Sequence, residues 1–126
     1  MRAVDTNVLV RLIARDDGRQ AESADRWVEN GAWVSILALA ETAWVLSSVY
    51  GRNPGEIASA IELLLNHEHL ILQDSEVVAA ALRRFRNRPT LGFADCLLLE
   101  LSRKEGHLPL GTFDRELSKL DGAEGL

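Results

Sequence analysis

Cysteine is almost absent from this chain of 126 residues, which contains Cys96 alone. One cysteine excludes an intrachain disulfide and suits the reducing cytosol. Cys96 lies in the apolar stretch "FADCLLLEL", so we expect a buried structural thiol rather than a nucleophile. The three histidines, His67, His69 and His107, do not combine with one cysteine into a zinc-ligand pattern.

Long apolar runs are also absent. The opening "MRAVDTN" has no apolar segment of the length that a signal peptide needs, and no run approaches the roughly 20 residues of a membrane span. We therefore expect a cytoplasmic protein that makes no membrane contact. The chain also has no internal repeat, no low-complexity segment and no glycine-rich phosphate loop of the Walker or Rossmann kind.

Positive charge is in short supply, because 14 Lys and Arg residues stand against 19 Asp and Glu residues, for a net charge of −5. This balance argues against a general nucleic-acid coat protein. The exception is "RRFRNR", residues 83–88. Its arginines either contact RNA phosphates or form a solvated helix face, and Phe85 between them is expected in the core. Arg11 and Arg15 are close to Asp5 in the sequence, and we expect each of them to face either RNA or an acid. The candidate RNA contacts are Arg11, Arg83, Arg84, Arg86 and Arg88.

The composition is otherwise that of a globular protein, with 47% hydrophobic and 26% charged residues, and its length fits one domain over residues 1–126. Short apolar runs predict strands over 2–4, 32–35, 70–73 and 108–112. Helical periodicity and capping residues predict helices over 7–14, 17–31, 36–50, 53–67, 74–87, 93–106 and 113–120. This alternation predicts an α/β fold with a parallel sheet and helices on both faces. In such folds, ligands bind beyond the carboxyl ends of the strands.

Two acids stand out in the first half of the chain. Asp5 directly follows a predicted strand, and the alternative to a functional role is an ordinary helix N-cap. Glu41 interrupts the apolar helix "LALAETAWVL". If its helix face is buried, an unpaired carboxylate would cost several kcal/mol, so Glu41 must be paired, functional or partly exposed.

Two more acids stand out in the second half. Asp95 is the only charge between Leu91 and Leu99, although it also fits a first-turn acid behind a Thr90 cap. Asp114 follows the last clear strand and equally fits a first-turn acid beside a Thr112 cap. If the four acids converge, their repulsion calls for a divalent cation such as Mg²⁺ or Mn²⁺. Carboxylate-held metal activates water at a phosphodiester.

Four segments, "VDTNVLVRLI", "LALAETAWVL", "GFADCLLLELSRKEG" and "LGTFDREL", resemble in order the motifs of PIN-domain nucleases, and in particular the VapC toxins of bacterial toxin–antitoxin pairs. The resemblance spans essentially the whole chain. It implies a three-layer fold with a central parallel sheet of four to five short strands between helices. The C-terminal "LDGAEGL" has fewer apolar residues than the family's final strand, which leaves a last edge strand open.

The resemblance also implies a site and an activity. Asp5, Glu41, Asp95 and Asp114 would hold Mg²⁺ or Mn²⁺. Asp5 and Asp95 would be the first choice as direct ligands, and Glu41 and Asp114 would complete the metal sphere directly or through water. The supporting polar residues would be Thr6, Asn7 and Thr112. The activity would be endonucleolytic cleavage of structured RNA such as tRNA or rRNA by metal-activated water. Such toxins form homodimers and are silenced by a cognate antitoxin.

Two other functions are compatible with the fold class. A receiver domain of a signalling pathway is similar in length and acidity, but it needs paired acids after its first strand, where this chain has Asp5, Thr6 and Asn7. Its phosphorylated aspartate would be Asp74, which we predict to cap a helix, and its lysine Lys104. The second alternative is a PIN fold that serves only as a binding scaffold, against which the presence of all four acids argues.

Overall fold

The computed structural model describes all of residues 1–126, as seven helices and five strands. The helices are α1 (Thr6–Ala14), α2 (Gly18–Val28), α3 (Ile36–Ser48), α4 (Pro54–Leu65), α5 (Ser75–Asn87), α6 (Phe93–Lys104) and α7 (Arg115–Ser118). The strands are β1 (Arg2–Ala3), β2 (Ala32–Val34), β3 (Leu70–Leu72), β4 (Leu110–Thr112) and β5 (Ala123–Gly125). The α/β class is confirmed, and each predicted helix is present with its ends within three residues of the prediction.

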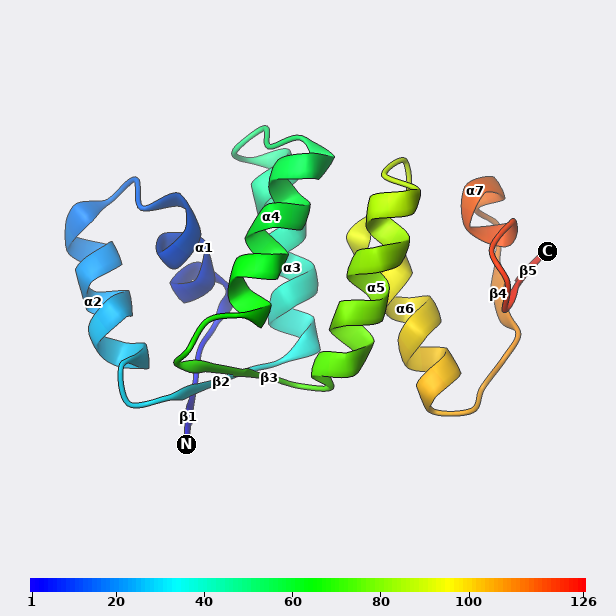
Figure 1. The fold of residues 1–126 in the computed structure, drawn as a ribbon. Helices are drawn as coiled ribbons and strands as arrows, with labels where there is room; N and C mark the ends of the chain where they lie inside the picture. The colour runs from blue at the N-terminus through cyan, green and yellow to red at the C-terminus, as the bar shows by residue number, and fades with distance from the viewer.

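Strands β1, β2 and β3 form a parallel sheet in that order, with Ala32 paired to Leu70. Along β2, Ala32 and Val34 are buried whereas Trp33 between them is 39% exposed, and β3 alternates in the same way around Ile71. Because successive strand residues point to opposite faces, helices cover one face of this sheet and the other face is open. In Figure 1, β2 and β3 run along the lower edge of the molecule, and the helices stand above them.

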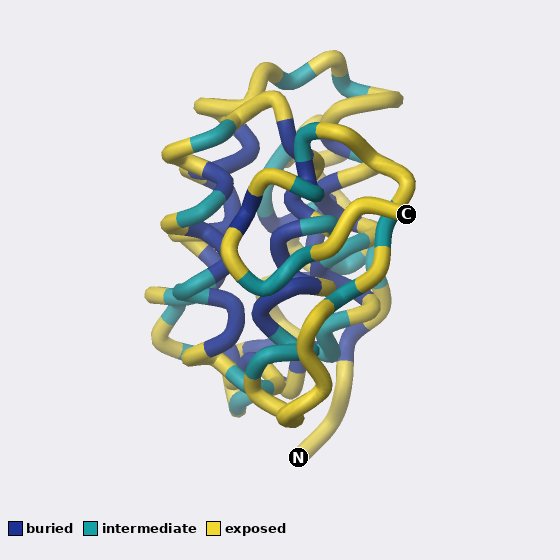
Figure 2. The backbone as a smooth tube through the Cα atoms, turned by 90° about the vertical axis from the view of Figure 1, so that its right-hand side faces the viewer, coloured by how far each residue is buried: buried dark blue, intermediate teal, exposed yellow.

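The C-terminal strands form a sheet of their own. β4 pairs in parallel with β5, Leu110 facing Ala123, so the last strand that the sequence left open is present. The expected single sheet is divided, because β4 makes no ladder with β1. Arg103 of α6 fastens this end of the chain by donating from Nη2 to the carbonyl oxygen of Asp121 at 2.7 Å. Figure 2 shows this C-terminal segment as a largely exposed layer in front of buried segments.

Local capping signals decide where several helices begin. Asn53 and Glu56 form the predicted capping box of α4, with Pro54 in its first turn. The predicted Thr90 cap of α6 is wrong, because Gly92 takes the N-cap position and no side chain caps that end. The prediction that the Asp74 side chain caps α5 is also wrong.

Asp74 has a left-handed backbone with φ of 46°, and its carboxylate makes no capping hydrogen bond to α5. Instead, it forms an ion pair with Lys104 of α6, which also binds Glu76. These contacts hold the pKa of Glu76 below its ordinary value and raise the pKa of Lys104. Asp74 therefore ties the start of α5 to the end of α6.

Helix α3 has two apolar faces, of which only one is buried. The face in the core carries Ala38, Leu39, Thr42, Ala43 and Leu46. On the opposite face, Leu37 is 68% exposed, Trp44 is 67% exposed, and Glu41 between them is also exposed. The burial cost considered for Glu41 therefore does not arise, because its carboxylate lies in water.

Aromatic residues divide between the core and the surface. Phe85 is buried against Phe93, as predicted, with the rings edge to face at 5.8 Å. The three tryptophans lie at the surface, since all of them are at least 39% exposed. Trp27 has a clear local role, since its indole N–H donates to the Ala3 carbonyl oxygen at 3.0 Å and Arg2 stacks on its ring.

None of the helices combines the length and the apolar character that a bilayer crossing requires.

Candidate active site

Asp5 lies between β1 and α1 and is the N-cap of that helix. Its Oδ1 accepts a hydrogen bond from the Val8 backbone N–H at 3.2 Å, so the capping interpretation is correct. The second oxygen, Oδ2, has no hydrogen-bond partner in the chain, and the residue is exposed. A structural role therefore leaves half of this carboxylate free for a ligand.

Glu41 reaches the same place from α3. The Thr6 hydroxyl Oγ1 donates to Glu41 Oε2 at 3.2 Å, which joins the start of α1 to the middle of α3. A hollow of about 390 Å³ is lined by Asp5, Thr6, Asn7 and Glu41, among others. Thr6 and Asn7, predicted to support the site, thus lie beside two of the candidate acids.

Asp95 lies in the first turn of α6 and is half-buried. Desolvation raises the pKa of its carboxyl above the ordinary value, and the negative charge of Asp114 raises it further. The next residue, Cys96, is fully buried, and desolvation together with the charge on Asp95 raises the pKa of its thiol to about 11. A thiol of this kind is protonated at neutral pH and is no nucleophile.

Asp114 lies between β4 and α7 and is the N-cap of α7. Its Oδ1 accepts from the Leu117 N–H at 2.9 Å, so the prediction that Thr112 is the cap is wrong. Thr112 has a different part, because its Oγ1 accepts from the Asp114 N–H at 3.0 Å and fixes the turn that carries the carboxylate. Asp114 is exposed, with Oδ2 free of hydrogen bonds within the chain.

The four acids therefore lie as two pairs, which we call the N-terminal pair (Asp5 and Glu41) and the C-terminal pair (Asp95 and Asp114). Nowhere in the chain are three or more Asp, Glu, His or Cys side chains grouped closely enough to hold a metal ion. The physical reason for the separation is the divided sheet. Asp5 follows β1 and Asp114 follows β4, and these two strands are not neighbours in a ladder.

Each pair nevertheless has the donor chemistry of a magnesium site. Mg²⁺ is typically held by one or two carboxylates while it keeps several waters and binds substrate phosphates, and Mn²⁺ prefers the same oxygen ligands. The mutual repulsion of Asp95 and Asp114 is a free-energy cost that a bound cation would relieve. The residues present thus fit a divalent ion at a pair, without the single four-acid group that the sequence predicted.

A comparison with known protein families gives a match to the model described as PIN domain, over residues 2–123. The chain belongs to the PIN domain family. PIN domains are generally nucleases and typically use divalent metal ions. Neither the curated proteins nor the solved structures gave a match.

Most of the candidate RNA-binding arginines of this PIN domain are engaged with acids of other elements. Arg84 Nε lies 2.9 Å from buried Glu100. Arg86 pairs with Glu62 at 2.8 Å, and Arg88 with Glu116 at 3.7 Å. Such partners explain these side chains as cross-links between elements.

The two arginines near Asp5 in the sequence, Arg11 and Arg15, are engaged as well. Arg11 donates to the Tyr50 hydroxyl at 2.9 Å and to Asp16, and so holds the end of α3 against the loop after α1. Arg15 forms a two-bond ion pair with Asp25, which lowers the pKa of that carboxyl. By contrast, Arg83 is exposed and has no acidic partner.

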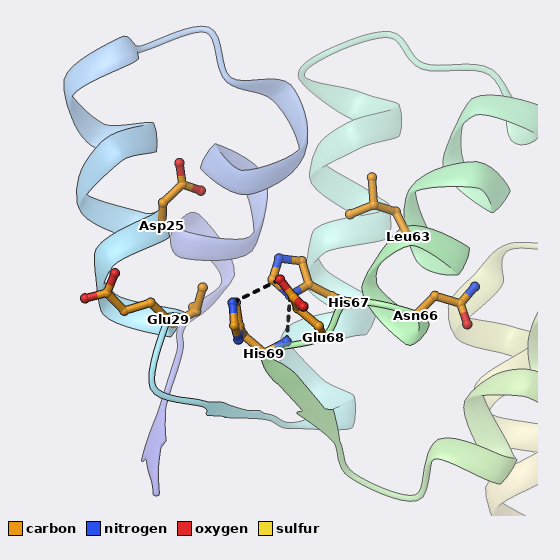
Figure 3. A pocket seen from close by; sticks show the side chains of 8 residues that line it. Asp25, Glu29, Leu63, Asn66, His67, Glu68 and His69 are labelled. Carbon is orange, nitrogen blue, oxygen red and sulfur yellow. Dashed lines mark hydrogen bonds and ion pairs between the residues drawn. The ribbon is translucent and has the colours of Figure 1, made fainter.

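The largest hollow of the PIN domain, about 600 Å³, lies away from all four candidate acids, between the end of α2 and the turn before β3 (Figure 3). Three of its polar residues, His67, Glu68 and His69, contact one another. His67 Nδ1 accepts from the His69 N–H at 3.1 Å, and His69 Nε2 lies 3.3 Å from Glu68. Asp25 at its rim is already paired with Arg15. The size of this hollow therefore does not make it a site.

Proposed function

We propose that this PIN domain is a Mg²⁺- or Mn²⁺-dependent endoribonuclease that hydrolyses RNA phosphodiesters. The observation that carries the proposal is the C-terminal pair, in which Asp95 lies half-buried in the first turn of α6 and Asp114, from a separate element, is exposed with its Oδ2 free of hydrogen bonds within the chain. Desolvation, and then the negative charge of Asp114, raise the pKa of Asp95, and perturbed pKa values are concentrated at functional sites.

The chain's own residues have distinct tasks in this proposal. Asp95 and Asp114 hold the cation, and the free Oδ2 of Asp5 is available as a further ligand. Thr6 orients the Glu41 carboxylate, whereas Thr112 fixes the turn before Asp114. When bound, the ion would activate a water for attack on phosphorus and stabilise the leaving oxygen.

We also propose the finer role of a toxin in a bacterial toxin–antitoxin pair. In this role the protein cleaves a structured RNA of the tRNA or rRNA class in the cytoplasm, works as a homodimer and is silenced by a cognate antitoxin. The support is the resemblance of its four motifs to VapC toxins, together with the PIN family match. A small neighbouring reading frame with a DNA-binding N-terminus would support the role, and growth arrest on expression of this chain alone would test it.

The experiment that tests the nuclease compares Asp95→Asn and Asp5→Asn with the wild type on total tRNA in Mg²⁺. We expect each variant to lose more than about 100-fold in cleavage rate, because even residues that only orient a metal ligand cost 10–100-fold. Glu105→Gln is the matched control, since Glu105 is an exposed acid at the other end of α6 without an ion pair. Full cleavage by Asp95→Asn, with circular dichroism unchanged, would contradict the mechanism.

A binding scaffold without catalysis is the second candidate, and the separation of the two acid pairs favours it. A scaffold would gain no stability from Mg²⁺, whereas an ion that binds only the folded state must stabilise it. The receiver alternative has one supporting contact, the ion pair between Asp74 and Lys104. It lacks the paired acids after β1, and a stable acyl phosphate on Asp74 after incubation with a small phosphodonor would be needed to support it.

A further inference from the structure

A groove of about 220 Å³ lies where α3, α4, α5 and α6 meet, and none of the residues that line it belongs to the candidate active site. Its floor is apolar, with Ile57, Phe85 and Phe93 among the lining side chains. The loops that join α3 to α4 and α5 to α6 lie at the same end of the molecule, at the top of Figure 1, and both contribute to the groove. This volume is below the roughly 300–1,000 Å³ of pockets for drug-sized ligands, so the groove suits a single ring system.

Trp44 stands at the rim of the groove as an unused aromatic surface. Its side chain is 67% exposed, and its indole N–H donates to no atom of the chain. Trp27 provides the contrast, because its N–H and its ring are both occupied. An exposed tryptophan beside a hollow offers a face on which a planar ring can stack.

Arg52 is the only charged residue that lines the groove. It is half-buried, yet its guanidinium makes no ion pair and no hydrogen bond within the chain, unlike Arg84 or Arg86. A planar cation held at the edge of an apolar groove without an acid is complementary to an anion, and guanidinium matches phosphate in geometry.

The groove also adjoins both acid pairs along the chain. Ala40, in its wall, precedes Glu41, and Ala94, in the opposite wall, precedes Asp95. Each wall is therefore continuous with a helix that carries one candidate acid. A ligand in the groove would therefore contact two of the helices that carry candidate acids, α3 and α6.

We propose that this groove receives one unpaired nucleobase of the RNA substrate, stacked on Trp44, while Arg52 binds an adjacent phosphate. The proposal rests on the endoribonuclease function proposed above and adds how the substrate is held. A stacked base must be unpaired, so the groove selects single-stranded loops or ends, which is where proteins read RNA. RNA is favoured over a second copy of this chain because it supplies together a planar ring for Trp44 and a phosphate for Arg52, whereas a second copy would bring the same apolar groove and the same cation.

The test measures binding in EDTA, so that cleavage plays no part. The ligand is a fluorescein-labelled single-stranded RNA of about ten nucleotides, within the roughly 4–16 nucleotides that such sites cover. We expect Trp44→Ala to weaken the affinity about 5- to 150-fold, the range for loss of one stacked base, and Trp44→Phe to retain most of it. Trp33→Ala, which removes an exposed tryptophan on the open face of the sheet, is the matched control and should bind as the wild type does.

Arg52 has its own readout. The logarithm of the affinity should fall with the logarithm of the salt concentration. Arg52→Gln should make this fall less steep by about 0.7, the value for one phosphate contact on a single strand, and Arg52→Lys should restore the steeper fall. Wild-type affinity in Trp44→Ala overturns the proposal. Unchanged RNA affinity with a dimer-to-monomer shift in sedimentation also overturns it, and assigns the groove to a contact between copies.

Failure of this proposal and failure of the nuclease function can be told apart. A chain that never cleaves RNA, but whose binding depends on Trp44 and Arg52, rejects catalysis and keeps the groove. A chain whose cleavage requires Asp95 while its RNA affinity ignores Trp44 keeps catalysis and rejects the groove.

Discussion

The N-terminal pair and the C-terminal pair are built alike. Each combines an acid that caps a helix after a strand, Asp5 or Asp114, with an acid on a longer helix, Glu41 or Asp95. Their surroundings differ, because the Thr6 hydroxyl binds Glu41 in the N-terminal pair, whereas Asp95 and Asp114 face each other's charge with Asp95 half-buried. The N-terminal pair is thus stabilised by the chain itself, and the C-terminal pair is the one that a cation would relieve.

The largest expected difference between the pairs is in metal-linked stability. At Mg²⁺ a hundred times its Kd, a single site that exists only in the folded state adds about 2.7 kcal/mol to the free energy of unfolding. We expect Asp95→Asn to lose most of this gain and Glu41→Gln to lose less, as measured by urea denaturation with and without Mg²⁺.

Potassium chloride at equal ionic strength controls for charge screening in that measurement. If Asp95→Asn is stabilised by Mg²⁺ as much as the wild type is, the ion binds at the N-terminal pair instead. Equal losses in both variants would indicate that the two pairs act on one ion in solution, although they lie apart in this structure.

Local signals in the sequence were enough to predict several helix starts, the protein family and the fold class. Asp5 and the Asn53 capping box were readable because a cap depends on residues only three positions apart. The order of the four acidic motifs was enough to predict the PIN family, which the match over residues 2–123 confirms. The alternation of elements likewise gave the α/β class.

The tertiary arrangement was not readable in the same way. Helix α3 is apolar on both faces, so its periodicity cannot show that Glu41 and Trp44 lie on the exposed one. Strands of two or three residues carry no signal for their partners, and the pairing of β4 with β5 rather than β1 separates Asp114 from Asp5. Nothing in the sequence distinguishes Arg52 from the other arginines, because whether a charge lacks a partner depends on the positions of all the acids in the folded chain.

The next effect concerns the capping role in the N-terminal pair. Asp5→Ala removes the N-cap of α1 and should destabilise the protein by about 0.5–2 kcal/mol, whereas Asp5→Asn keeps a good cap and should leave stability nearly unchanged. Urea denaturation in EDTA measures both. Because both variants remove the charge, a large loss in Asp5→Asn would show that the charge rather than the cap matters.

The link between Thr6 and Glu41 should count for less. Thr6→Val removes one exposed hydrogen bond, so we expect a loss of about 0.5 kcal/mol, at the low end of the range for such bonds. Thr6→Ser retains the hydroxyl and is the control. If cleavage falls in Thr6→Val much further than stability does, the hydroxyl serves to orient Glu41.

The smallest effect is the pH dependence of the C-terminal pair, because solvent screens a half-buried carboxyl. Desolvation and the charge of Asp114 raise the pKa of Asp95 in the folded state above its unfolded value, so between the two values the folded state binds more protons. The free energy of unfolding contributed by Asp95 therefore falls as pH rises through that window. Relative to the wild type, Asp95→Asn should gain stability as pH rises from about 3 to about 7, a range that spans the ordinary Asp pKa near 3.9. Asp114→Asn should show part of the same gain, because it removes the neighbouring charge. Urea denaturation in EDTA over this pH range measures the free energy of unfolding of all three proteins. If their pH profiles are parallel, the two carboxylates of the C-terminal pair do not repel each other.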